Sequence, residues 1–143
     1  MNGKQHLVVL LALLVSLPPH AAAAGKPRAP DWKKPTDALL ACAESRDKPC
    51  IEEAVETLVA LGSGADPAIR ALLTSDNEVA VEAGLQVLAR TGLQGAADFA
   101  AGLLGGEDYD FKAPVAEALG AFRGPGIVRA LTGVAGSPRP FER

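Results

Sequence analysis

Apolar residues recur at intervals of three and four along most of this chain, as in Ile51, Val55, Leu58 and Leu61. That spacing places them on one face of an α-helix. The strict alternation of apolar and polar residues that is typical of a β-strand is absent. The pattern therefore predicts an all-α protein with one helix after residues 36–37, a turn at 47–49, and further helices at about residues 50–61, 67–73, 75–91, 95–104, 111–122 and 125–134.

Local signals at the ends of these segments support the helices. Thr36 and Asp37 are typical N-cap residues, and Pro67 suits the first position of a helix. Gly62 and Gly92 each follow an apolar helical stripe, where glycine commonly terminates a helix. We therefore expect short helices that are joined by tight turns.

Three leucines occur at near-constant spacing, since Leu58, Leu88 and Leu119 lie 30 and 31 residues apart. The same offset aligns Val55 with Leu85 and Ala116, and Leu73 with Leu103 and Val134. One helical hairpin cannot bury its apolar face alone, so such units stack into arrays. The period predicts an α-solenoid of about three and a half units. The alternative is a plain helical bundle in which an Ala- and Leu-rich chain produces chance matches.

Residues 111–120 (FKAPVAEALG) resemble the second helix of a HEAT-like repeat, with its Val-Arg pair at Phe111 and Lys112 and its Ala-Leu-Gly at 118–120. Residues 58–62 resemble the end of another copy. Over residues 36–134 the chain is similar to the short HEAT-like repeats of the phycobilisome-lyase type. The resemblance implies an array of helical hairpins whose second helices line the concave side.

Gly84, Gly102 and Gly120 lie inside expected helices. Glycine in a helix interior costs about 1 kcal/mol relative to alanine. We expect these glycines to let neighbouring helices approach closely; the alternative is drift in a tolerant array.

The N-terminus has the features of a secretory signal peptide. Lys4 precedes an apolar run at residues 7–17, prolines at 18–19 interrupt the run, and residues 21–25 are small. A membrane anchor is the alternative, but a span needs about 20 apolar residues. We therefore predict a leader at 1–24 and a secreted or periplasmic mature chain without a membrane span. A Pro-rich basic arm at 25–35, the repeat domain at 36–134 and a tail at 135–143 follow.

The predicted mature chain lacks the residues that common catalytic and cofactor sites need. His6 and His20 leave with the leader, so no histidine remains for a Ser-His-Asp triad, and two cysteines alone do not make a zinc site. Neither a phosphate-binding nor a dinucleotide-binding glycine motif occurs. Without Lys4, 13 basic residues face 17 acidic ones, which disfavours nucleic-acid binding. We expect no enzyme activity, no cofactor and no metal.

Cys42 and Cys50 are the two cysteines of the chain. They flank the expected turn between the first two helices, where an antiparallel hairpin brings them face to face. An exported chain with two cysteines is expected to oxidise them, so we predict a structural disulfide. A redox pair, or a thiol that carries a ligand, is the alternative.

Polar residues occupy equivalent positions on the expected second helices. Glu56, Gln86 and Glu117 lie two residues before the repeated leucines, and Glu52 and Glu82 lie one turn earlier. On the concave side that the resemblance implies, they would form an acidic surface for a protein or a basic peptide. The alternative is that they are ordinary solvated faces.

Three functions remain open at this point. The first is an exported, non-catalytic protein-interaction module or scaffold. The second is a thiol-dependent or chromophore-lyase-like enzyme, which requires a free cysteine. The third is an assembly subunit that docks through its C-terminal helix, where Ile127, Val128, Leu131 and Val134 form an apolar stripe with no following helix to cover it.

Overall fold

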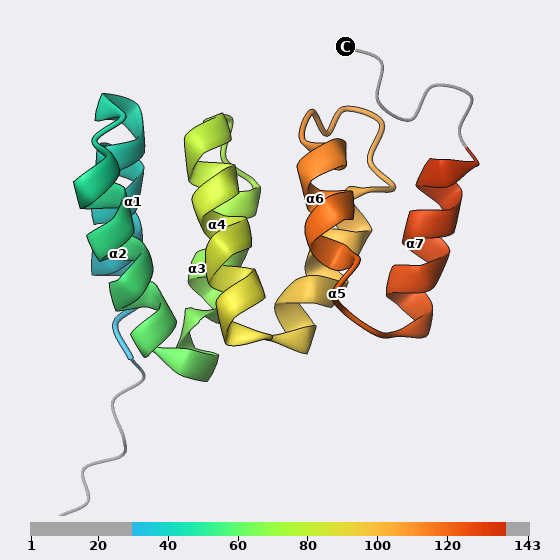
Figure 1. Cartoon of the computed structure of the whole chain (residues 1–143), viewed down its shortest axis with the longest axis horizontal. Helices are drawn as coiled ribbons and strands as arrows, with labels where there is room; N and C mark the ends of the chain where they lie inside the picture. The colour runs from blue at the N-terminus through green and yellow to red at the C-terminus, as the bar shows by residue number, and fades with distance from the viewer. Residues whose placement is uncertain (1–29, 137–143) are drawn as a thin grey trace, which may run out of the picture.

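The computed structural model describes residues 30–136, and within that range the chain is all-helical. The leader predicted at 1–24 and most of the tail lie outside the described residues. The helices are α1 (Lys33–Ser45), α2 (Lys48–Ala60), the 3-10 helix η1 (Gly62–Ala65), α3 (Asp66–Leu73), α4 (Glu78–Thr91), α5 (Gln94–Leu103), α6 (Lys112–Leu119) and α7 (Pro125–Ala135) (Figure 1). No helix in this part of the chain is long and apolar enough to cross a bilayer.

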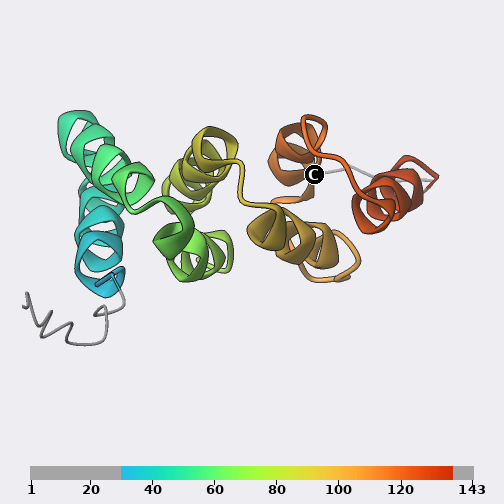
Figure 2. The same ribbon diagram turned by 90° about the horizontal axis from the view of Figure 1, so that it is seen from below.

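Consecutive helices pack as pairs, and the pairs stand side by side in a row (Figure 1). Helix α1 packs on α2, α3 on α4, and α5 on α6. Contacts between pairs run along two layers, one through α1, α3, α5 and α7 and the other through α2, α4 and α6 (Figure 2). Short connections force each helix to return beside its predecessor, and this produces the two layers.

A single hydrophobic core lies between the two layers. The three repeated leucines, Leu58, Leu88 and Leu119, belong to α2, α4 and α6, and all three are fully buried. Replacing a buried leucine by alanine typically costs about 2–5 kcal/mol. The apolar spacing in the sequence therefore identified fully buried side chains of the core.

Several helix ends follow the local signals. The Asn77 side chain accepts a hydrogen bond from the Val79 amide (2.9 Å) and so caps α4. Gly62 and Gly92 adopt positive φ values of 55° and 65° after α2 and α4, a conformation that glycine reaches without strain. The predicted glycine terminations are confirmed.

The predicted start of the first helix is wrong. Helix α1 begins at Lys33, so Thr36 is buried inside its first turns and donates its hydroxyl to the Trp32 carbonyl (2.6 Å). Pro35 is tolerated because the first turn of a helix contains amides that have no intrahelical acceptor. Helix α1 therefore takes in residues 33–35, which were assigned to the Pro-rich basic arm, and Trp32 packs against the core.

Other boundaries also differ from the prediction. Lys48 and Pro49, expected in a turn, form the first turn of α2, because Asp47 is the N-cap and its carboxylate accepts from the Cys50 amide (3.4 Å). Helix η1 was not predicted. Helix α6 is shorter than expected and ends before Gly120.

The close-approach hypothesis holds for one of the three helical glycines. A Cβ atom on Gly84 would lie 2.8 Å from the Cβ of Leu72, so the absence of a side chain sets the spacing of α3 and α4. A Cβ on Gly102 would meet nothing within 4 Å, and Gly120 caps the end of α6 rather than lying in its interior.

Candidate interaction surface

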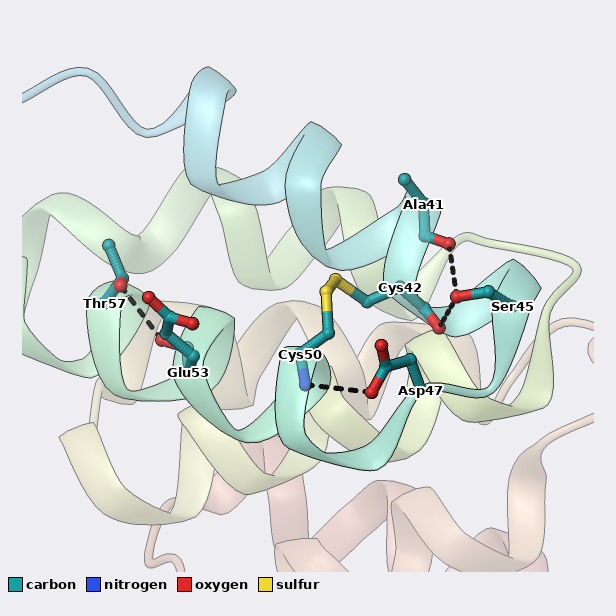
Figure 3. The surroundings of a disulfide bond; sticks show 7 residues. All are labelled: Ala41, Cys42, Ser45, Asp47, Cys50, Glu53 and Thr57. Atoms are coloured by element: carbon teal, nitrogen blue, oxygen red, sulfur yellow. Dashed lines mark hydrogen bonds between the residues drawn. A yellow bond between two sulfur atoms is a disulfide. The ribbon is translucent and has the colours of Figure 1, made fainter.

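Cys42 and Cys50 join α1 to α2. Their Cα atoms lie 5.6 Å apart, and the structure pairs the two sulfur atoms as a disulfide (Figure 3). The turn between them is closely bonded, since Asp47 caps α2 and the Ser45 hydroxyl donates to the Cys42 carbonyl (3.0 Å). The two cysteines therefore lie at the separation that the predicted disulfide requires, and no free thiol remains in the described part of the chain.

The five residues of the predicted binding surface all lie exposed on the layer of α2, α4 and α6. Helix α2 supplies Glu52 and Glu56, α4 supplies Glu82 and Gln86, and α6 supplies Glu117. Three of the five, Glu52, Glu82 and Gln86, line one cavity of about 330 Å³ between α2 and α4. We call this the α2–α4 cavity.

The α2–α4 cavity has walls of mixed character. Ile51, Val79 and Ala83 contribute apolar surface to it, and Arg46 and Lys48 also line it. Lys48 lies four residues before Glu52, about 6 Å along the helix. The cavity therefore has Arg46 just before α2 and Lys48 at its start, Glu52 one turn further on, and Glu82 on α4. The surface is less uniformly acidic than the sequence suggested.

Glu56 does not line the cavity but forms an ion pair across the two helices. Arg90 of α4 donates to both carboxylate oxygens of Glu56, at 2.6 and 2.9 Å. The hydrogen bonds between Arg90 and Glu56 are the main cause of a lowered pKa for Glu56 and a raised pKa for Arg90, and the opposite charge of each partner adds to both shifts. The two residues are 34 positions apart in the sequence, so helical periodicity carried no signal for this pair.

A second arginine, Arg70 of α3, bridges to the next pair of helices. Its guanidinium bonds Asp66 (2.6 Å), donates to the Gly95 carbonyl (3.1 Å) and lies 4.9 Å from the ring centroid of Phe99. The hydrogen bond with Asp66, more than its charge, raises the pKa of Arg70. The sequence showed the Asp66–Arg70 spacing of four, which suits a helical ion pair, but not the contacts with α5.

The acidic loop before α6 is anchored by Tyr109. Its hydroxyl donates to the carbonyl of Leu73, the last residue of α3 (2.9 Å), and its ring packs edge-on against Phe111 with centroids 5.9 Å apart. Burial raises the pKa of Tyr109 to about 12. In residues 30–136 no group of three or more His, Cys, Asp or Glu side chains is placed to hold a metal ion.

The apolar stripe of α7 is only partly open to solvent. Ile127 and Val134 are buried against the core and Leu131 is half-buried, whereas Val128 is 60% exposed. A larger cavity of about 860 Å³ lies between α5 and α7 and reaches Lys112 at the start of α6. We call this the α5–α7 groove; sequence patterns did not reveal it.

Comparison with known proteins gives no relative for this chain. No protein-family model, no curated protein and no solved structure matches it.

Proposed function

We propose that this chain is an exported, non-catalytic protein-interaction module, an α-solenoid of HEAT-like repeats that binds a basic segment of another protein. The paired arrangement of α1 to α6 in two layers supports a repeat array, as does the burial of Leu58, Leu88 and Leu119 at a period of about 30. Arrays of this kind present extended surfaces for partners.

Export is supported by two separate features. The leader pattern at residues 1–24 is that of a secretory signal. The pairing of Cys42 with Cys50 suits an oxidising compartment, where such bonds form and persist. Because both sulfurs are bonded to each other, neither is available as the nucleophile that a thiol-dependent enzyme requires.

The α2–α4 cavity is the observation that carries the binding proposal. Glu52 and Glu82 come from different helix pairs yet line the same cavity, together with the amide of Gln86. Neither carboxylate has an ion-pair partner among the described residues. A lysine or arginine side chain can place its aliphatic stem on Ile51 and Val79 and its charge between the carboxylates.

Binding of a labelled decapeptide of alternating lysine and alanine, measured by fluorescence anisotropy, tests this site. We expect Glu52→Gln and Glu82→Gln each to weaken binding about threefold to fivefold, because each removes one exposed charge pair. Raised salt should weaken binding as well. Glu53→Gln is the matched control, since Glu53 is the exposed neighbour of Glu52 and does not line the cavity. Equal effects of all three variants would move the binding surface elsewhere.

A further inference from the structure

The α5–α7 groove has a volume of about 860 Å³, and glycines on both of its helix walls add no side chains to it. Gly102 of α5 and Gly126 and Gly133 of α7 all line it. A Cβ atom added to any of the three would meet no atom within 4 Å. A volume of about 860 Å³ is within the range of cavities that bind small ligands or short peptide segments.

The polar groups on the groove carry a positive excess. Lys112 and Arg129 line it, and neither forms an ion pair with any residue in 30–136. The one carboxylate on the groove, that of Asp98, already accepts a hydrogen bond from the Gln94 amide (3.0 Å). The groove therefore has two cations without ion-pair partners and one carboxylate that already accepts a hydrogen bond.

One of the two helices that start at the groove adds to this positive character. Lys112 is the first residue of α6, and Pro125 is the first residue of α7. Neither helix has an acidic residue in its first turn or a side-chain cap. The positive end of the α7 dipole therefore has no acidic side chain in the first turn to offset it, whereas the acidic loop at residues 107–110 lies just before α6.

We propose that the α5–α7 groove binds an acidic, extended segment of a partner protein. The carboxylates of that segment pair with Lys112 and Arg129, and its smaller side chains occupy the space beside the glycines. A polyanionic nucleic acid is disfavoured because the chain has a net charge of −3.

The α5–α7 groove is lined mainly by helices of one layer and the α2–α4 cavity by helices of the other. The groove has two cations and one carboxylate on its walls, whereas the α2–α4 cavity has two of each, so the positive excess is a property of the groove alone. The inference rests on the groove alone and stands whether or not the α2–α4 cavity binds a basic segment. With both sites occupied, the protein acts as an adaptor that links an acidic and a basic partner.

The test is binding of a labelled decapeptide of alternating glutamate and alanine to the purified chain, followed by fluorescence anisotropy. We expect a dissociation constant below about 1 mM at low salt and weaker binding as salt rises. Arg129→Glu and Lys112→Glu should each weaken binding about tenfold, because each exchanges an attraction for a repulsion. Arg123→Glu is the matched control: Arg123 is exposed, does not line the groove, and should change affinity less than twofold.

A second pair of variants tests the groove by its volume. Gly133→Leu fills the groove and should weaken binding at least tenfold. Ala135→Leu is the control, since it places the same leucine side chain at an exposed position of α7 outside the groove. Circular dichroism melts verify that both variants are folded.

Four outcomes would overturn the proposal. They are no binding of the acidic peptide, equal loss in the control variants, equally tight binding of a single-stranded oligonucleotide, and a concentration-dependent dimer that Gly133→Leu abolishes. The last would assign the groove to a second copy of this chain. Loss of acidic-peptide binding in Glu52→Gln would likewise show that the two sites are not separate.

Discussion

Substituting alanine for Gly84 tests the close contact between α3 and α4. In most helix interiors this change is stabilising, because glycine costs about 1 kcal/mol relative to alanine. Here the new Cβ atom would lie 2.8 Å from the Cβ of Leu72, a fully buried residue of α3. A Cβ atom is fixed to the backbone and cannot rotate away, so α3 and α4 would have to move apart.

The size of the effect follows from two opposing terms. Overpacking a close-packed interior costs about 1–3 kcal/mol, and the gain in helix propensity offsets about 1 kcal/mol of that. We expect Gly84→Ala to lower the free energy of unfolding by about 1 kcal/mol. Gly102→Ala is the matched control, since its Cβ would meet nothing within 4 Å, and it should raise the free energy of unfolding by about 0.5–1 kcal/mol.

Urea denaturation followed by circular dichroism measures both free energies from the midpoint and slope of the transition. The two variants should differ by about 1.5–2 kcal/mol, or roughly 6–16 °C in melting temperature for a domain of this size. If Gly84→Ala stabilised the protein as much as Gly102→Ala, α3 and α4 would not be held together at Gly84, and the reasoning would be refuted.

Three further predictions concern single interactions. Cys42→Ser should lower the free energy of unfolding by about 2–3 kcal/mol, because the unfolded chain regains the entropy that the closed loop removes. In urea denaturation without reductant, the variant should be as stable as the reduced parent. A variant as stable as the oxidised parent would contradict the disulfide. Because the pKa of Glu56 is lowered in the folded state, its ion pair stabilises the protein above the unfolded pKa of Glu56, and this stabilisation is lost as pH falls through the folded pKa. The free energy of unfolding, measured as a function of pH, should therefore fall less on acidification in Arg90→Leu than in the parent. Identical pH dependence in the two proteins would show that the pair contributes nothing. Tyr109→Phe should cost about 1 kcal/mol by leaving the Leu73 carbonyl without its donor. Because burial raises the pKa of Tyr109 to about 12, the parent should lose more stability than the variant as pH rises above 10 towards 12. Urea denaturation followed by circular dichroism at each pH measures the stability of both proteins, and tyrosinate absorbance reports the ionisation of Tyr109, the one tyrosine of the chain, in the parent alone.

Much of the secondary structure could be read from the sequence because its causes are local. The intervals of three and four reflect the helical repeat, which depends only on neighbouring residues. Asn77 caps α4 and Gly92 terminates it, and each acts on backbone groups only a few residues away. The equal spacing of Leu58, Leu88 and Leu119 also identified buried residues, because stacked units of equal length need a core side chain at equal intervals. The start of α1 was missed because Pro35 was treated as a breaker, although the first turn of a helix tolerates it.

The meeting of side chains across helices was decided only by the tertiary structure. Glu52 and Glu56 belong to one helix, and their positions in the sequence predicted the same role for both. In the structure Glu56 pairs with Arg90, whereas Glu52 lines a cavity. Tyr109 reaches a carbonyl 36 residues away on α3. The α5–α7 groove exists because α7 packs on α5 with glycines on both walls. These arrangements depend on the distances and crossing angles between helices, which the packing of the whole core determines. Residue intervals along the chain therefore do not predict them.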